Sequence, residues 1–384
     1  KTITNKEIMK IVQAIKKGDE PFVFQNSNQL KEPLVLVFGN RYMLESEHIF
    51  NEVRALFPEG HIVFGTTSGE IIDDKVLEGT VVLTAIEFEK SKILVKRCNV
   101  KDYQHDDKKM GTKLAAQFPK EHLKHLFVIS EGSSVNGSAL IEGIEHLNNN
   151  GCGLSGGLCG DDDRFEKTLA SYNESPKEGE IVAIGFYGDT LEISSANYGG
   201  WTTFGPERII TKSQGNILYE LDGKPALDLY KTYLGEKAKE LPKSALLYPL
   251  SVKTTENSEP LVRTILNIDE VENTMTLAGD IPEGARVQLM MSSVDDIANG
   301  AFHAAELAME NRKSSPELAL LISCIGRKLV MDQRTEEEIE EVKAVIGDNT
   351  VISGFYSYGE MAPFSGQDSC KLHNQTMTLT LFSE

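Results

Sequence analysis

The sequence has no run of about 18 consecutive apolar residues, the length that a helix needs to cross a bilayer. Its five cysteines are scattered and include no CxxC pair, so no disulfide framework is expected and reduced thiols in the cytoplasm are predicted. Basic residues are also few, because 39 Lys and Arg stand against 58 Asp and Glu, giving a formal net charge of -19. That charge repels phosphate backbones and anionic lipid surfaces, so neither nucleic-acid binding nor membrane insertion is predicted.

Enzyme signatures are missing or match by letter only. There is no P-loop and no HExxH motif. Gly151–Gly156 has the letters of GxGxxG, but it follows a predicted helix, whereas a dinucleotide fingerprint follows a strand. Gly153–Gly157 has the letters of GxSxG around Ser155, but more glycines and three aspartates follow in place of the helix that a nucleophile elbow requires. No catalytic residue is therefore predicted.

Clusters of metal ligands are missing as well. Cys370 and His373 are three residues apart, but they supply two ligands where a zinc site needs three or four. Asp161–Asp163 lack the spacing and the distal Glu of an EF-hand, so a solvated acidic loop is favoured. No metal site is predicted.

The chain does repeat one order of elements, in which a strand and a helix lead to a second strand, a Gly-containing loop and a final strand. Mostly apolar runs, typical of strands covered on both faces, predict strands at Leu34–Phe38, Ile62–Gly65, Leu126–Ser130, Ile181–Tyr187, Leu318–Ser323 and Val351–Gly354. Val81–Phe88 and Thr376–Phe382 alternate more between apolar and polar residues, which predicts antiparallel strands with one partly polar face. Helices are predicted at Glu45–Phe57, Ser138–Asn148 and about 334–346. The fold class is therefore α/β, with mixed sheets built from repeated strand-helix-strand-helix-strand units in two related domains.

A boundary is expected around Leu221–Pro225, where a Gly and a Pro precede the predicted helix Ala226–Leu234. This divides the chain into a first domain at 30–222 and a second, ligand-binding domain at 223–384.

A glycine-flanked turn at 354–360 is the most informative candidate site. Tyr356 and Tyr358 offer flat apolar faces with polar tips, and Glu360 can receive an ammonium group. Arg327 follows the strand at 318–323 and can clamp a carboxylate in bidentate fashion. Together these residues would suit a zwitterion such as an amino acid. Two alternatives stay open, because Arg327 and Glu360 can pair with each other and the tyrosines can pack in the core.

Three further residues are candidate ligand contacts. Asn374 leads into the last strand, where a structural role in holding the turn by backbone hydrogen bonds is the alternative. Ser68 and Glu70 occupy the equivalent turn near the N-terminus, since both turns end in Gly-Glu shortly after a serine, as Ser68-Gly69-Glu70 and Ser357-Tyr358-Gly359-Glu360.

These motifs resemble those of the FIST family. The end of the FIST C domain is similar to Gly354–Pro363 and Leu372–Thr380, and its Cys-x-Gly-Arg element to Ser323–Arg327. The FIST N pattern is similar to Gly65–Ile71 and Gly156–Asp161, followed by Phe165. One departure is Met361, where isoleucine is usual.

The resemblance implies an intracellular signal-transduction input module that binds a small ligand, with an amino acid as the usual suggestion. Family members often accompany histidine kinase, cyclase or chemotaxis output domains, so a separate output protein is expected as the partner here. The predicted function is a small-molecule sensor and not an enzyme.

Two other functions remain as alternatives. Some family members are proposed to bind haem and sense nitric oxide, for which His303, His373, Cys324 or a tyrosine would supply the axial ligand. A hydrolase would use Ser155 or Cys324 with a nearby histidine, although no convergent nucleophile and base can be recognised.

Overall fold

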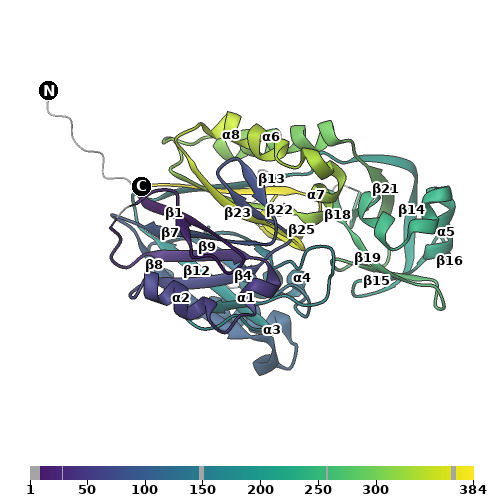
Figure 1. The fold of residues 1–384 in the computed structure, drawn as a ribbon. Coiled ribbons are helices and arrows are strands. Elements are labelled where there is room, and N and C mark those ends of the chain that lie inside the picture. The colour runs from purple at the N-terminus through teal and green to yellow at the C-terminus, as the bar shows by residue number, and fades with distance from the viewer. Residues whose placement is uncertain (1–8, 28, 147–150, 257, 365–368) are drawn as a thin grey trace.

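The computed structural model describes residues 9–27, 29–146, 151–256, 258–364 and 369–384 (Figure 1). The described residues form four sheets. Three of these sheets are each built around four core strands, and the arrangement of the four strands is the same in all three. The first unit contains β1 Lys10–Lys17, β3 Leu34–Gly39, α1 Arg41–Leu44, α2 Ile49–Leu56, β4 His61–Thr66 and β7 Thr80–Glu87. The second unit contains β8 Lys92–Asn99, α3 Asp107–Ala115, β9 Leu123–Ser130, α4 Gly137–Glu145, β10 Gly153–Leu158 and β12 Glu180–Tyr187. The third unit contains β13 Glu192–Tyr198, α6 Val294–Met309, β22 Leu318–Cys324, α7 Ile325–Met331, α8 Glu337–Ile346, β23 Val351–Ser357 and β26 Met377–Ser383.

Strand pairing is the same in the three units. In each, a strand pairs in parallel with the strand reached through a helical crossover, as in β3–β4, β9–β10 and β22–β23. The third strand returns antiparallel on the other side of the first, and the strand that opens the unit lies beyond it. The strand orders are therefore β4-β3-β7-β1, β10-β9-β12-β8 and β23-β22-β26-β13. Helical crossovers between parallel strands explain why these strands are apolar on both faces.

Each unit gives the segment between its second and third core strands to the sheet of another unit. From the first unit, β5 Glu70–Ile72 and β6 Lys75–Leu77 extend the third sheet next to β23. From the second unit, β11 Ala170–Tyr172 extends the first sheet next to β4. From the third unit, β24 Gly359–Pro363 and β25 Cys370–His373 extend the second sheet next to β10. The exchange is cyclic, so the three units form one interlocked core.

The centre of this core draws apolar side chains from all three units. Phe38 of the first unit packs with Phe355 of the third at a ring-centroid distance of 4.7 Å, and Phe127 of the second unit belongs to the same buried cluster. Burial of such large side chains is the main stabilising contribution to folding.

The fourth sheet belongs to an inserted unit, residues 202–291, which lies at the right of Figure 1 and separates β13 from α6. Its elements include β14 Thr202–Gln214, β15 Ile217–Leu221, α5 Ala226–Leu234, β17 Leu250–Lys253, β18 Leu261–Arg263, β19 Ile265–Asp269, β20 Thr274–Leu277 and β21 Arg286–Met291. It has its own apolar core around Tyr230 and Leu218. The chain enters the inserted unit through β14 and leaves it through β21. Thr202, the first residue of β14, and Met291, the last residue of β21, are register partners.

The predicted α/β fold with mixed sheets is confirmed, and each predicted strand has a counterpart. Two local predictions are wrong. The turn predicted at 354–360 consists of the ends of β23 and β24, with Tyr358 alone between them. The helix predicted at 45–57 begins later than expected, because α2 covers only Ile49–Leu56, and the separate helix α1 ends at Leu44, before the predicted start. Residues 147–148 of the predicted helix Ser138–Asn148 lie outside the described residues.

Candidate functional site

The turns of the three units meet at the backbone carbonyl of Asp162. Ser68, from the turn of the first unit, donates its hydroxyl hydrogen bond to this oxygen at 3.2 Å. Tyr358, from the turn of the third unit, donates to the same oxygen at 3.1 Å. Asp162 has φ of 48°, so its carbonyl is presented from a left-handed conformation. Residues from the three equivalent turns are thus joined at one acceptor.

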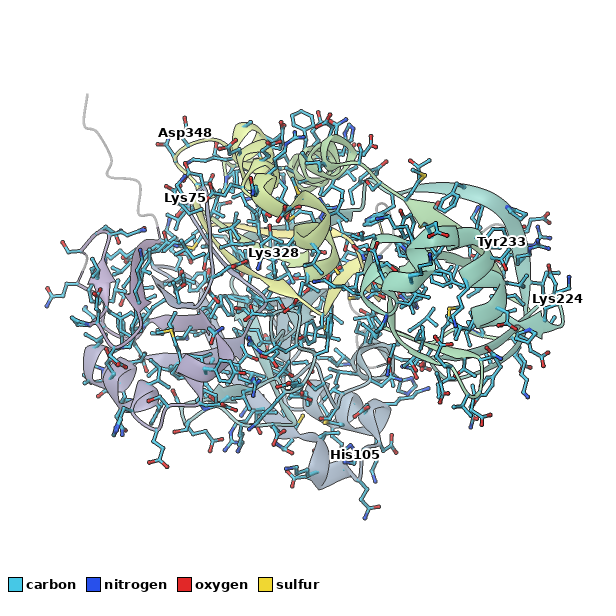
Figure 2. All side chains as sticks on the ribbon, turned by 45° about the vertical axis from the view of Figure 1, so that its right-hand side comes forward. Lys75, His105, Lys224, Tyr233, Lys328 and Asp348 are labelled. Atoms are coloured by element: carbon cyan, nitrogen blue, oxygen red, sulfur yellow. The ribbon has the colours of Figure 1, made fainter. Side chains whose placement is uncertain are left out.

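Two cavities adjoin this junction. Cavity I, of about 810 Å³, lies where the second and third units face the inserted unit. Cavity II, of about 750 Å³, lies between the loop after β10 and helix α7, with Lys328 in its lining. Figure 2 shows Lys328 near the middle of the molecule, whereas Lys224 and Tyr233 mark the far end of the inserted unit. Both cavities are lined by Asp163, Arg164 and Leu329, so they are neighbours across a shared wall.

The loop that carries this shared wall is held by a buried carboxylate. Asp161 is fully buried and accepts hydrogen bonds from the Nε atoms of Arg41 and Arg164, both at 2.9 Å. The backbone N–H of Lys167 donates to its other oxygen. The ring of Tyr42 has both guanidinium groups nearby, with centroid distances of 4.6 and 4.7 Å. Because buried charge-assisted hydrogen bonds are strong, the start and the end of the loop are fixed relative to the first unit.

Between these anchors the loop presents Phe165 to cavity I. Its φ of 53° is unusual for a bulky residue that is not glycine. The Phe165 N–H donates to Tyr358 Oη at 3.1 Å, and the two rings stack with centroids 4.5 Å apart and planes 18° apart. Both rings line cavity I. The contacts with Tyr358 therefore offset the backbone strain at Phe165.

Arg327, the predicted carboxylate clamp, lies in the interior of the third unit. Its side chain is fully buried and forms an ion pair with Glu338 of α8 at 2.8 Å. The same guanidinium donates to the carbonyl oxygens of Gly199 and Ile297. Tyr356 is also fully buried and donates its hydroxyl hydrogen bond to Glu338. Arg327 thus takes Glu338, and not Glu360, as its ion-pair partner, and these contacts connect α7, α8 and β23.

Glu360 and Glu70 occupy equivalent positions at the starts of β24 and β5. Glu360 is fully buried and accepts hydrogen bonds from the hydroxyls of Ser357 at 2.6 Å and Thr376 at 2.9 Å. Glu70 is 1% exposed and accepts from Thr67 and Thr80. Burial raises the pKa of Glu360 to about 8 and that of Glu70 to about 7, against the lowering effect of these hydrogen bonds. Glu360 is therefore largely protonated at neutral pH.

The other predicted contacts lie at different depths. Tyr358 is the one member of the predicted set in the lining of cavity I, while Ser68 is buried behind cavity II, where its carbonyl accepts from Lys328. Asn374 is buried at the junction with the inserted unit, and its Oδ1 accepts from the backbone N–H of Thr264 at 3.4 Å. The structure joins Ser68 and Tyr358 through Asp162, and it separates them from Asn374.

Arg164, Phe165 and the lining from the inserted unit were not predicted as site residues. Phe165 follows a Gly-rich motif that the sequence does display, and that motif was the available signal. Leu246 and Leu277 also line cavity I, but in the sequence they are ordinary apolar residues of a β-rich segment. They reach the cavity only because the inserted unit packs against the second and third units.

The residues considered for hydrolysis are inaccessible. Ser155 lies on β10, fully buried, with its hydroxyl 2.6 Å from His125 Nε2 and 2.7 Å from Thr380 Oγ1. Burial lowers the pKa of His125 to about 3. Cys324 is buried as well, and burial raises its pKa well above its usual value. A Ser–His contact is present, but no substrate can reach it in this conformation.

The two histidines and the cysteine considered for haem lie outside the linings of both cavities. His373 is buried on β25 and contacts the carbonyl oxygen of Ala362 through Nε2, and burial lowers its pKa to about 4. His303 is on the surface of α6 beside Glu306. No histidine or cysteine is found among the described residues that line cavities I and II. The hydroxyl of Tyr358, which lines cavity I, donates to the Asp162 carbonyl and accepts from the Phe165 N–H. Within the described parts of the chain, no group of three or more His, Cys, Asp or Glu is arranged to hold a metal ion.

Comparison with known proteins assigns the chain to a family. The FIST N domain matches residues 33–224 and the FIST C domain matches residues 226–363. A protein of Methanocaldococcus jannaschii, described as "Uncharacterized protein MJ1623", is 26% identical over 255 residues, which is 58% of this chain and 46% of that protein. The chain therefore spans about half the length of this relative. Across the ranges that the structure describes, no helix has the length and apolar character needed to span a membrane. The chain belongs to the FIST family of signal-transduction sensor modules.

Proposed function

We propose that the protein senses a small polar metabolite, most simply an amino acid, which binds in cavity I. The observation that carries this proposal is the composition of the cavity wall. It includes Asn136 at the start of α4, Tyr358 and Leu329 of the third unit, and Leu246 and Leu277 of the inserted unit. A ligand held there contacts parts that belong to separate sheets. Its binding free energy therefore depends on how those parts are arranged, which is the requirement for a sensor.

The chemistry of the lining supports a zwitterionic guest with an apolar side chain. Charges of both signs lie around cavity I, including Asp163 and Glu166 against Arg164 and Lys243. Helix α4 begins at this wall, and the dipole of a helix favours a negative group near its N-terminus. The volume of about 810 Å³ is within the range of small-molecule sites.

This proposal changes the roles of most residues predicted as ligand contacts. Tyr358 stays in the binding wall. The buried pair of Arg327 and Glu338, with Tyr356, holds α7 so that Leu329 faces the cavities. By the same reasoning, Ser68, Glu70, Glu360 and Asn374 fix the turns behind the walls.

We further propose that the protein is not an enzyme and that a separate protein reads its signal. The FIST family is not a family of known enzymes, and the buried positions of Ser155 and Cys324 support a role in packing. The reader would be a signalling output protein such as a histidine kinase, a cyclase or a chemotaxis component. Five buried cysteines, none in a disulfide, are consistent with a cytoplasmic location.

The test is a thermal-shift screen of the chain against the twenty amino acids. A ligand at about 100 times its Kd adds about 2.7 kcal/mol to the free energy of unfolding, a readily measured rise in Tm. Leu329→Trp, which fills the shared wall of the cavities, should abolish the shift. The matched control Leu56→Trp, at an exposed position of α2, should preserve it. If no amino acid raises the Tm, the proposal of an amino-acid sensor is wrong.

A further inference from the structure

Cavity I has one wall with a character of its own, the stacked pair of Phe165 and Tyr358. One face of the Phe165 ring is covered by the Tyr358 ring at a centroid distance of 4.5 Å. The side chain of Phe165 is only half-buried, and it lines the cavity. A flat apolar surface is therefore available to a guest, next to a ring that is already held in place.

The backbone at Phe165 adds an independent observation. A φ of 53° is unfavourable for a phenylalanine, and glycine or asparagine would adopt it at lower cost. The strain persists because Asp161 anchors the start of the loop and Tyr358 Oη accepts the Phe165 N–H at 3.1 Å. Retained strain at a cavity wall is typical of a position that serves binding more than stability.

The rest of the wall near the ring is apolar, and the charged groups lie on the neighbouring residues of the loop. Leu158 and Leu329 line the same cavity. Leu246, Leu266 and Leu277 of the inserted unit line it as well. Asp163, Arg164 and Glu166 lie next to Phe165 in sequence and also line the cavity. A guest that places its charged groups on this loop thus has its side chain beside an aromatic ring and several leucines.

We infer that Phe165 is the specificity-determining residue of cavity I and that the site prefers amino acids with an aromatic side chain. The inference rests on the proposed function and names the class of its ligand. An aromatic side chain packs against the exposed part of the Phe165 ring, in the offset or edge-to-face geometry that aromatic pairs prefer. Alanine, serine and glycine lack the surface to use this wall. Tyr358 is a positioning residue in this arrangement, because its hydroxyl fixes the backbone of Phe165 and the carbonyl of Asp162.

The test uses the wild-type chain first. Dissociation constants for L-phenylalanine, L-tyrosine, L-tryptophan, L-leucine and L-alanine are measured by calorimetry. We expect the aromatic amino acids to bind at least about tenfold more tightly than L-alanine. Equal affinities across the series would overturn the inference while leaving an amino-acid sensor in place. Binding of none of them would overturn the proposed function together with the inference.

Two variants then locate the preference. Phe165→Leu keeps an apolar side chain and removes the ring, so the ratio of L-phenylalanine to L-leucine affinity should fall at least about fivefold. Phe24→Leu makes the same exchange at an exposed position on β2, Val23–Phe24, and should leave the ratio unchanged. Circular dichroism and Tm establish that both variants are folded. An unchanged ratio in folded Phe165→Leu contradicts the assignment.

Discussion

Two buried glutamates occupy equivalent turns of the first and third units and have raised pKa values. Glu360 is surrounded by hydroxyl and N–H donors, with no ion-pair partner among the described residues. Burial raises its pKa from 4.5 to about 8. The folded state then binds more protons than the unfolded state between these values, so the free energy of unfolding falls as the pH rises through this window. Glu70 acts in the same direction over a narrower range, since its pKa is raised to about 7.

Glu360→Gln should therefore stabilise the protein at alkaline pH. The amide is neutral, like the protonated carboxyl, and its oxygen can still accept from Thr376, so at pH 8.5 we expect a gain on the order of 1–3 kcal/mol over wild type. At pH 5 the difference should be small. Urea unfolding at both pH values measures it, with the exposed Glu121→Gln as the control. A difference that does not depend on pH would contradict the protonated state of Glu360.

Arg327→Ala separates a structural role from ligand contact. The substitution leaves Glu338 as a buried carboxylate without its ion pair, which costs about 3–5 kcal/mol. We expect a large loss of stability in urea unfolding, and a partial recovery in the double variant Arg327→Met, Glu338→Leu, in which both charges are removed. A variant of Arg327 with wild-type stability and no amino-acid binding would instead make Arg327 a ligand contact.

At the scale of elements, close approach of paired strands explains two of the glycines. A Cβ at Gly354 on β23 would lie 1.9 Å from the carbonyl oxygen of Leu321, and a Cβ at Gly156 on β10 would lie 1.9 Å from that of Val128. Both glycines belong to the second strand of a parallel pair, so the second and third units share this feature.

Gly354→Ala should accordingly be among the most destabilising single-methyl additions. The clash is with backbone, which cannot rotate away, so we expect a loss of several kcal/mol or failure to fold. Gly79→Ala is the comparison, because its φ of 63° is strained but its surroundings are open, and it should cost about 1 kcal/mol. Urea unfolding and soluble yield give the order. Equal losses in the two variants would mean that conformational strain, and not the clash, governs the effect.

Elements could be predicted from the sequence where burial is uniform. LVLVF and LALLIS are apolar on both faces, and they became the central strands β3 and β22. The sequence predicts a turn at 354–360, whereas the structure has strands there, because β24 pairs with β10, about 200 residues earlier in the chain, and local periodicity contains no information about that partner. The partner of Arg327 was missed for the same reason. Glu338 lies within the helix predicted at about 334–346, and its carboxylate reaches Arg327 only when α8 packs on the sheet.

For the whole molecule, the cyclic exchange of β5–β6, β11 and β24–β25 explains how a small movement can be transmitted. β5 and β24 begin next to Ser68 and Tyr358, which both donate to the Asp162 carbonyl. β11 begins just after Leu169, whose N–H donates to Thr66 of the first unit. A change at that junction therefore acts on strands of all three sheets. Packed elements of this kind shift between discrete arrangements more readily than they deform.

The inserted unit should be separable from this interlocked core. Thr202 and Met291 are antiparallel register partners, so their Cα atoms are only about 5 Å apart and a short glycine linker can replace residues between 201 and 292. We expect the shortened chain to fold with a single cooperative unfolding transition, because the three exchanged sheets remain complete. It should lose all amino-acid binding, since the Leu246 and Leu277 wall of cavity I is removed. Calorimetry and thermal shift measure both properties. Full affinity in a folded, shortened chain would place the ligand outside cavity I and direct attention to cavity II, whose lining includes no residue of the inserted unit among those described.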